Sequence, residues 1–377
     1  MRRTTKFAAL LTAGILALGA CGSDSDEPES GSDPTSEAPQ SDIKVGMAYD
    51  VGGRGDQSFN DSAAAGLDQA VDEFGIESEE GEAEDGEAES AREERLRTFA
   101  DAGYDPIIAV GFAYAASVGK VAEEYPDVHF AIIDDESLAD VPNVASLVFA
   151  EEQGSFLVGA AAALKTETDN IGFVGGVETP LIQKFEAGYI AGAQAVNPDI
   201  EVQSTYLTQI PDFSGFADPA KGKTAAEGMF DNGADVVYHA AGGSGGGVFE
   251  AAAAADGWAI GVDSDQYNTA DPSVQDVILT SMLKNVNVAV YNYIKEVVDT
   301  GEAPAGVTRY DLAVDGVGYS TSGGFIDDIT GDLDEYKQQI IDGEIEVPTA
   351  RDGQSVSGGS QHHPDGSAGR KPRGPVP

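Results

Sequence analysis

The stretch AYDVGGRGDQSFNDSAAAG, residues 48–66, places an acid, three glycines and a Phe-Asn pair directly after an apolar strand. IKVGMAY (43–49) reads as a buried strand, and SAAAGLDQAVDEFG (62–75) has a helical pattern. In open parallel sheets, ligands bind outside the carboxyl ends of the strands, where such loops lie. The stretch therefore predicts one side of a ligand site, and the rest of the chain must indicate the ligand.

Strands and helices alternate along the chain, which predicts parallel sheets of the α/β class. Apolar strands are expected at residues 43–49, 105–111, 129–134, 144–149, 170–176, 202–207, 234–240, 258–263 and 277–282. Helical patterns occupy residues 62–75, 115–125, 154–165, 185–196, 218–233 and 286–301. VGMAYDVGG…FNDSAAAGLDQA and IGFVGGVE…FEAGYIAGAQA resemble each other weakly, which indicates two similar halves.

The amino terminus, MRRTTKFAALLTAGILALGAC, has the pattern of a targeting segment. A positive region precedes an apolar run at residues 7–18 that is short for a bilayer span. The following LGAC resembles a bacterial lipobox, so we expect residues 1–20 to be a lipoprotein signal peptide. Cys21, the single cysteine of the chain, is then the lipid-modified residue. An ordinary secretory signal followed by a stray cysteine is the alternative.

The net charge of the chain argues against binding to nucleic acids. The sequence has 66 acidic and 21 basic residues, a formal net charge of −45. Nucleic acids require basic patches, so they are excluded as partners. Residues 21–42 and 351–377 carry no core-forming pattern and are expected to be a lipidated, disordered acidic tether and a disordered tail. The acidic segment 77–94 is expected to be a solvated insertion or helix face, without an assigned function.

Acids, glycines and one lysine follow the expected strands at the same end. The residues at these positions are Asp50, Gly111, Phe112, Asp134, Gly175, Gly176, Gly242, Gly243, Ser244, Asp263 and Lys284. Each has an ordinary explanation alone, because Asp often caps a helix and Gly often turns a loop. Their recurrence at successive strand ends is the stronger signal, and it predicts a polar site at this edge of the strands.

These motifs resemble the basic membrane protein family, the purine-nucleoside receptor lipoproteins of ABC importers. The resemblance rests on D-x-GG-x-x-D-x-SFN (50–60), GYDPIIAVGF, YPDVHFAIID, FADPAKGK, GADVVYHAAGGSGGGVFEAA, GVDSDQ and LTSMLKN, and covers about residues 43–347. It implies a type I periplasmic-binding fold, in which two Rossmann-like lobes joined by crossover strands close on a ligand. Lobe 1 would comprise residues 43–150 and about 266–300, and lobe 2 residues 151–265 and about 301–347. The acidity of this chain departs from the "basic" of the family name.

The resemblance also implies a role for each site residue. Phe59 and Phe216 would sandwich a purine ring from opposite lobes. Asn60, Asp50 and Asp134 would hydrogen-bond the purine edge. Asp263 and Lys284 would hold the ribose hydroxyls, and the backbone at Gly242 would close against the sugar. Carboxylates repel phosphate, so such a pocket suits a nucleoside better than a nucleotide.

Some of these positions have neighbours that could take their place. Phe213 lies three residues before Phe216, and Asp135 follows Asp134 directly. Lys284 could instead pair with a carboxylate on a solvated surface.

Other functions remain as alternatives. A protein of the same fold could bind a sugar or another small solute, or act without a transporter as a sensory or adhesive lipoprotein. An esterase or nucleoside hydrolase could use Ser244, which lies in a G-x-S-x-G motif in a strand-to-helix turn. No histidine is placed as its base, so we expect no enzyme. The four histidines form no metal set, and we expect no cofactor.

The sequence thus predicts an extracytoplasmic receptor held at the cell membrane through its lipid anchor alone. Its expected partners are a nucleoside and the permease and ATPase subunits of an ABC importer. We expect the protein to be a monomer.

Overall fold

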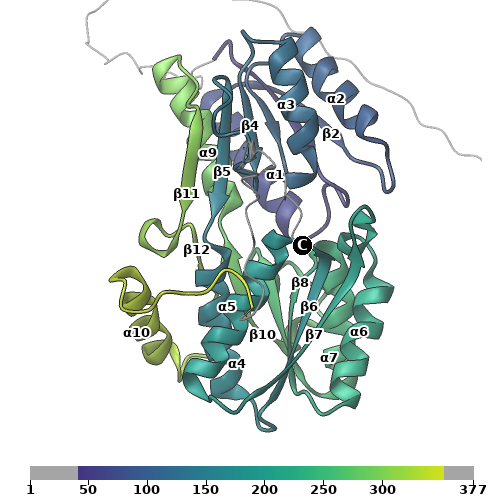
Figure 1. The fold of residues 1–377 in the computed structure, drawn as a ribbon, viewed down its shortest axis with the longest axis vertical. Coiled ribbons are helices and arrows are strands. Elements are labelled where there is room, and N and C mark those ends of the chain that lie inside the picture. Colours follow the sequence, from purple (N-terminus) through teal and green to yellow (C-terminus); the bar gives the residue numbers. More distant parts are fainter. Residues whose placement is uncertain (1–40, 352–377) are drawn as a thin grey trace, which may run out of the picture. The chain divides into compact units, whose positions relative to one another are not determined.

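The computed structural model describes residues 41–351, which form two six-stranded sheets flanked by helices (Figure 1). The first sheet has the order β11-β5-β4-β3-β1-β2, with all strands parallel. Its strands are β1 (Lys44–Tyr49), β2 (Glu77–Glu82), β3 (Ile107–Ala109), β4 (Phe130–Ile133), β5 (Val144–Phe149) and β11 (Gly306–Tyr310). The central strands β3, β4 and β5 are buried along their whole length, as expected where helices cover both faces of a parallel sheet.

The second sheet has the order β12-β10-β9-β8-β6-β7 and is parallel except for β12, which runs antiparallel to β10. Its strands are β6 (Asn170–Glu178), β7 (Glu201–Gln209), β8 (Val236–Ala240), β9 (Trp258–Asp263), β10 (Ile278–Lys284) and β12 (Val317–Tyr319). The expected α/β fold with two parallel sheets is therefore confirmed.

Each sheet has its own set of helices. The first is accompanied by α1 (Phe59–Phe74), α2 (Glu89–Asp101), α3 (Ala115–Glu124) and α9 (Val286–Thr300). The second is accompanied by α4 (Glu151–Lys165), α5 (Pro180–Val196), α6 (Pro219–Asp231), α7 (Gly245–Ala255), α8 (Gln266–Thr269) and α10 (Thr330–Ile341). Short 3₁₀ turns are η1 (Phe112–Tyr114), η2 (Phe213–Phe216), η3 (Gly242–Ser244), η4 (Gln275–Val277) and η5 (Leu312–Val314). None of these helices combines the length and apolarity of a bilayer span.

Helix α1 shows why these segments fold as they do. Its buried side chains include Ala63, Leu67, Ala70 and Phe74, which follow the helical period and form one face against the core. The helix ends at Gly75, whose φ of 64° is left-handed and whose N–H bonds to the carbonyl of Val71. Glycine adopts this conformation without the steric cost that other residues meet, so it ends the helix cleanly.

The chain crosses between the sheets three times, and the crossovers differ from those expected. The crossings lie between β5 and α4, between β10 and α9, and between β11 and β12. We expected residues 266–300 in lobe 1, and α9 does pack against α1 there, but β10 pairs with β9 and β12 in the second sheet. We expected residues 301–347 in lobe 2, but β11 pairs with β5 in the first. The short and largely exposed strand β11 has no apolar pattern that could have revealed it.

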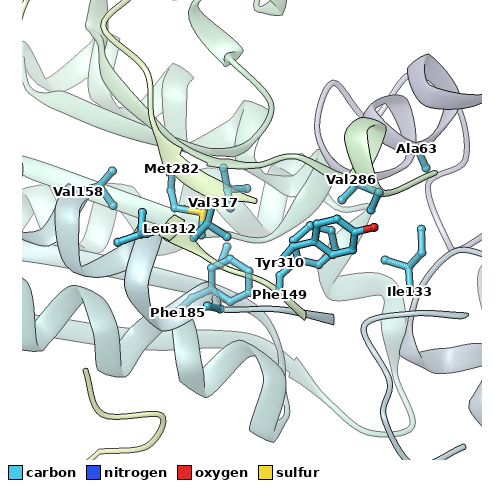
Figure 2. Close-up of a cluster of buried hydrophobic side chains, with 14 of the residues drawn as sticks. Ala63, Ile133, Phe149, Val158, Phe185, Met282, Val286, Tyr310, Leu312 and Val317 are labelled. Carbon is cyan, nitrogen blue, oxygen red and sulfur yellow. The ribbon is translucent and has the colours of Figure 1, made fainter. Parts of the chain in front are cut away.

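A hydrophobic cluster fills the crossover region (Figure 2). It combines side chains from the first sheet, such as Phe149 and Tyr310, with side chains from the second, such as Met282 and Val317. The rings of Phe149 and Tyr310 stack with centroids 5.2 Å apart. Because one hydrophobic core spans the crossings, it holds the two lobes together in the crossover region.

The nine expected strands are all present as β1, β3–β10, and the six expected helices are present as α1, α3, α4, α5, α6 and α9. The acidic segment 77–94 forms the edge strand β2 and the beginning of α2. The expected signal peptide, Cys21 and nearly all of the expected tether and tail lie outside residues 41–351, as do His362 and His363.

Candidate ligand-binding site

A cavity lies at the carboxyl ends of strands from both sheets. Its space, including open solvent at the mouth, amounts to about 570 Å³. All eight residues proposed from the sequence line it: Asp50, Phe59, Asn60, Asp134, Phe216, Gly242, Asp263 and Lys284. The other lining residues are Val51, Asp56, Gly111, Phe112, Leu181, Ile182, Phe185, Ala240 and Val262.

Asp56 organises the first turn of α1, a role that the sequence reasoning did not assign. Its carboxylate accepts hydrogen bonds from the backbone N–H groups of Ser58, Asn60 and Asp61, at 2.9, 2.8 and 3.1 Å. It also accepts from the side-chain amide of Asn60 at 3.1 Å, while the amide oxygen of Asn60 accepts from the backbone N–H of Asp50 at 3.2 Å. Asn60 is therefore held in one orientation. The D-x-S-F-N spacing was a visible signal for this cap.

All four acids of the cavity lining, Asp50, Asp56, Asp134 and Asp263, have raised pKa values, and burial is the main cause in each. Burial raises the pKa of Asp50 to about 6, although the nearby charge of Arg92 opposes the shift. It raises the pKa of Asp134 to about 6 and that of Asp263 to about 7, in both cases against the charge of Lys284. The cavity therefore concentrates hydrogen-bond acceptors whose charge is costly in the absence of donors.

Lys284, the last residue of β10, is the cation of the cavity lining, and its side chain is 2% exposed. Its ammonium lies 2.5 Å from a carboxylate oxygen of Asp134 and 3.2 Å from one of Glu151. Burial lowers the pKa of Lys284, but the charges of Asp134, Glu151 and Asp263 outweigh this effect and raise the pKa above its ordinary value. Lys284 thus pairs with carboxylates, as in the alternative interpretation, but in the interior and not on a solvated surface.

Aromatic rings surround this ammonium and line the cavity from both lobes. The Lys284 nitrogen is 5.1 Å from the ring centroids of Phe59 and Phe149 and 5.5 Å from that of Phe185. Phe59 is the first residue of α1, in the first lobe, whereas Phe216 ends η2 in the second. A side chain at Gly176 of β6 would collide with the Phe216 ring, so that glycine makes room for the ring.

The structure separates the residues that the sequence left ambiguous. Phe216 lines the cavity, whereas the ring of Phe213 packs against Phe112 with centroids 6.0 Å apart. Asp134 lines the cavity, whereas Asp135 accepts hydrogen bonds from the backbone N–H and hydroxyl of Ser137.

Ser58 joins the two lobes beside the cavity. Its hydroxyl donates to Asp263 at 2.5 Å, and its carbonyl accepts from the hydroxyl of Ser264 at 3.0 Å. The side-chain amide of Gln266 also donates to the carbonyl of Gln57 at 3.0 Å. The first-lobe loop before α1 is therefore bonded directly to the second-lobe loop after β9, a contact that the sequence reasoning missed.

Ser244 does not have the environment of a nucleophile. Its buried hydroxyl donates to the carbonyl of Gly215 and accepts from the backbone N–H of Asp218, both at 2.8 Å. The nearest candidate base, His239, packs edge-on against Phe249, and burial lowers its pKa to about 3. Within residues 41–351, no group of His, Cys, Asp or Glu is arranged to hold a metal ion.

Two parallel-dominated α/β sheets with interleaved helices define the type I periplasmic-binding-protein fold. Residues 43–351 match the Bmp family model, described as "ABC transporter substrate-binding protein PnrA-like". The chain belongs to this family of substrate-binding proteins, as the sequence motifs predicted.

Similar proteins agree with this assignment. The chain is 37% identical over 359 residues to the "CD4+ T-cell-stimulating antigen" of Listeria innocua, covering 90% of this chain and 96% of that protein. It is 32% identical over 369 residues to the "ABC transporter nucleoside-binding protein BmpA" of Lactococcus lactis, covering 92% and 99%. Among solved structures, an ABC transporter solute-binding protein from Aeropyrum pernix matches with a TM-score of 0.71 and 32% identity, covering 82% and 94%.

Proposed function

We propose that this protein captures a purine nucleoside outside the cell membrane and delivers it to the permease of an ABC importer. The observation that carries the proposal is the composition of the cavity. Phe59 and Phe216 line it from opposite lobes, and buried carboxylates with one paired lysine supply its polar groups. The similarity to a protein named as nucleoside-binding supports the same ligand class.

The two rings suit a flat heterocycle. Stacking a base on an aromatic side chain contributes roughly 1–3 kcal/mol and tolerates different bases. Asn60, fixed by Asp56 and by the backbone of Asp50, and the carboxylate of Asp50 lie in the same lining and can meet the polar edge of a purine.

The acids near Lys284 suit the hydroxyls of a pentose. One carboxylate oxygen of Asp134 is buried and, within residues 41–351, accepts no hydrogen bond. Such an acceptor is costly to leave unfilled, and a hydroxyl of the ligand would satisfy it. An ammonium has three N–H donors, and Lys284 pairs with two carboxylates, so one donor remains for the ligand.

The charge of the cavity opposes nucleotides. Asp50, Asp56, Asp134 and Asp263 all line it, whereas Lys284 is already paired. A phosphate would bring further negative charge toward these carboxylates, so we propose that the receptor takes nucleosides and rejects nucleoside monophosphates.

The proposed location rests on the sequence outside the described residues. Signal peptidase cleavage before Cys21 and lipidation of its sulfur would anchor the protein on the outer side of the membrane. Residues 22–42 would then link the lipid to the folded lobes. Each buried CH₂ of an acyl chain contributes about 0.8 kcal/mol, so two or more chains hold such a protein at the membrane.

Calorimetric titration of the protein, expressed with Cys21→Ser to avoid lipidation, tests the ligand. We expect inosine, guanosine or adenosine to bind, and ribose and AMP to bind at least 100-fold more weakly, about 2.7 kcal/mol. Phe59→Ala and Asp263→Ala should each abolish most of the binding, whereas Asp135→Ala, which alters an acid outside the cavity, should bind like the parent. Tight binding of ribose alone would identify a sugar receptor, and release of free base from inosine would identify a hydrolase.

A further inference from the structure

The strand orders show where the lobes can separate. The crossovers connect β5, β10, β11 and β12, which lie at or beside one edge of the two sheets. The opposite edges are β2 in the first sheet and β7 in the second (Figure 1). If the lobes rotate about the crossovers, the segments that follow β2 and β7 undergo the largest displacement. Contacts between these segments therefore have the greatest leverage on closure.

Phe213 makes such a contact. It begins η2, which follows β7, and its ring lies 6.0 Å from that of Phe112 in η1, at an interplanar angle of 50°. The guanidinium of Arg92, in α2, lies 5.5 Å from the centroid of the Phe213 ring. A single second-lobe ring is therefore packed against an aromatic and a cation of the first lobe.

The other partners of Arg92 belong to its own lobe, and they include a carboxylate oxygen of Glu89 at 4.0 Å. Its guanidinium lies 5.8 Å from the ring centroid of Tyr114, and its Nε lies 3.5 Å from a carboxylate oxygen of Glu87. That carboxylate is already engaged by Arg95, at 2.7 and 3.0 Å. The Nε of Arg92 is buried and makes no hydrogen bond within the described chain. Because Arg92 is 4% exposed, the cover supplied by Phe213 keeps its charge out of water.

We propose that Phe213, Phe112 and Arg92 form a latch that holds the lobes shut and sets the rate of ligand release. Phe213 does not line the cavity, so it makes no direct contact with a ligand there, whereas its partner Phe112 does line the cavity. Opening would separate Phe213 from both partners, and cation–π contacts are stronger when desolvated. Phe216, three residues later in the same turn, has the separate task of contacting the ligand. The part of this proposal that concerns ligand release rests on the proposed function, whereas the part that concerns closure of the lobes does not.

Phe213→Ala and Phe216→Ala form a matched pair for the test, made in the full chain with Cys21→Ser. Small-angle X-ray scattering without ligand would report the closure of each variant. Stopped-flow fluorescence would report the dissociation rate of inosine. Phe213→Ala should increase the radius of gyration and raise the dissociation rate about tenfold, a change of about 1.4 kcal/mol, with the same preference for inosine over AMP. Phe216→Ala should weaken binding while leaving the radius of gyration unchanged, because its ring lies against Gly176 of its own lobe.

Phe213→Leu separates the parts of the latch, because leucine keeps the apolar cover and loses the ring. It should fall between the parent and Phe213→Ala. A parent-like radius of gyration and dissociation rate in Phe213→Ala would overturn the latch. If the parent itself binds no nucleoside, the proposed function fails, and the scattering comparison still decides whether Phe213 holds the lobes shut.

Discussion

Two buried cations lie between the lobes, and their surroundings differ. Lys284, beside a crossover, is paired with Asp134 and Glu151 and is within cation–π distance of three phenylalanine rings. Arg92, at the opposite edge, lies between Tyr114 and Phe213 and shares Glu87 with another arginine. Lys284 and Glu151 border segments that cross between the sheets, whereas Arg92 faces a ring of the other lobe.

The difference follows from what each edge must do. Near the crossovers, a buried ion pair does not oppose rotation of the lobes. Lys284 and Glu151 both border crossing segments and keep their contact. At the opposite edge, a fully paired charge would resist separation of the lobes, whereas an aromatic contact of modest energy can break and form again. The two edges thus combine a permanent joint with a reversible one.

The largest expected effect tests the permanent joint. Lys284→Met would leave the buried carboxylates of Asp134 and Glu151 without their cation, and breaking a buried pair in this way costs about 3–5 kcal/mol. Urea denaturation at pH 7.5 should show this loss. Arg92→Met is the matched control at the opposite edge and should cost only about 1 kcal/mol, because Glu87 keeps Arg95 and the side chain of Glu89 is exposed. Equal losses in the two variants would remove the contrast between the edges.

The pH dependence of stability tests the electrostatics of the cavity. The pKa of Asp263 is about 7 in the folded protein, against an ordinary value of 3.8. The folded state therefore holds a proton that the unfolded chain releases, and the free energy of unfolding falls as pH rises from about 4 to 7. Asp263→Asn removes this loss and should be more stable than the parent by roughly 2–4 kcal/mol at pH 8, at 1.36 kcal/mol for each pKa unit.

This advantage should become small near pH 4, close to the ordinary pKa of 3.8, because the acid is protonated in both states only below that pKa. Denaturation midpoints measured from pH 4 to 8 would show it, with Asp135→Asn as a control outside the cavity. A constant difference between Asp263→Asn and the parent across this range would contradict the assigned role of burial.

The smallest expected effect concerns Gly176, which makes room for the Phe216 ring beside the cavity. Gly176→Ala would displace the Phe216 ring and should weaken inosine binding about tenfold, or 1.4 kcal/mol. Gly228→Ala is the control, because a side chain there meets open space on α6 and should slightly stabilise the helix. If Gly176→Ala binds like the parent in a calorimetric titration, Phe216 does not contact the ligand as proposed.

The sequence was sufficient to predict the sheets and the position of the site. Buried parallel strands are short apolar runs, so β1 and β3 to β10 were recognisable. Their carboxyl ends meet at one edge of each sheet, which is why Asp50, Asp134, Asp263 and Lys284 could be grouped before the structure was known.

The sequence could not reveal the features that depend on distant contacts. β2 consists mostly of glutamates, and β11 is largely exposed, so neither has the composition of a buried strand. The exchange of β10 and β11 between the lobes follows from pairing partners, which local patterns do not encode. Phe213 and Phe216 differ only in which neighbours they meet, and Arg92 belongs to an acidic segment that seemed uniformly solvated.

The glutamate-rich strand β2 has a consequence for the behaviour of the protein at high density. It forms the outer edge of its sheet, with residues ESEEGE and a backbone that pairs on one side with β1. An uncovered strand is a template for joining another chain, but a second copy approaching this one would meet an identical row of negative charges. Self-association through this border is therefore opposed by repulsion, and because salt weakens that repulsion, high protein concentrations should be tolerated best at low ionic strength.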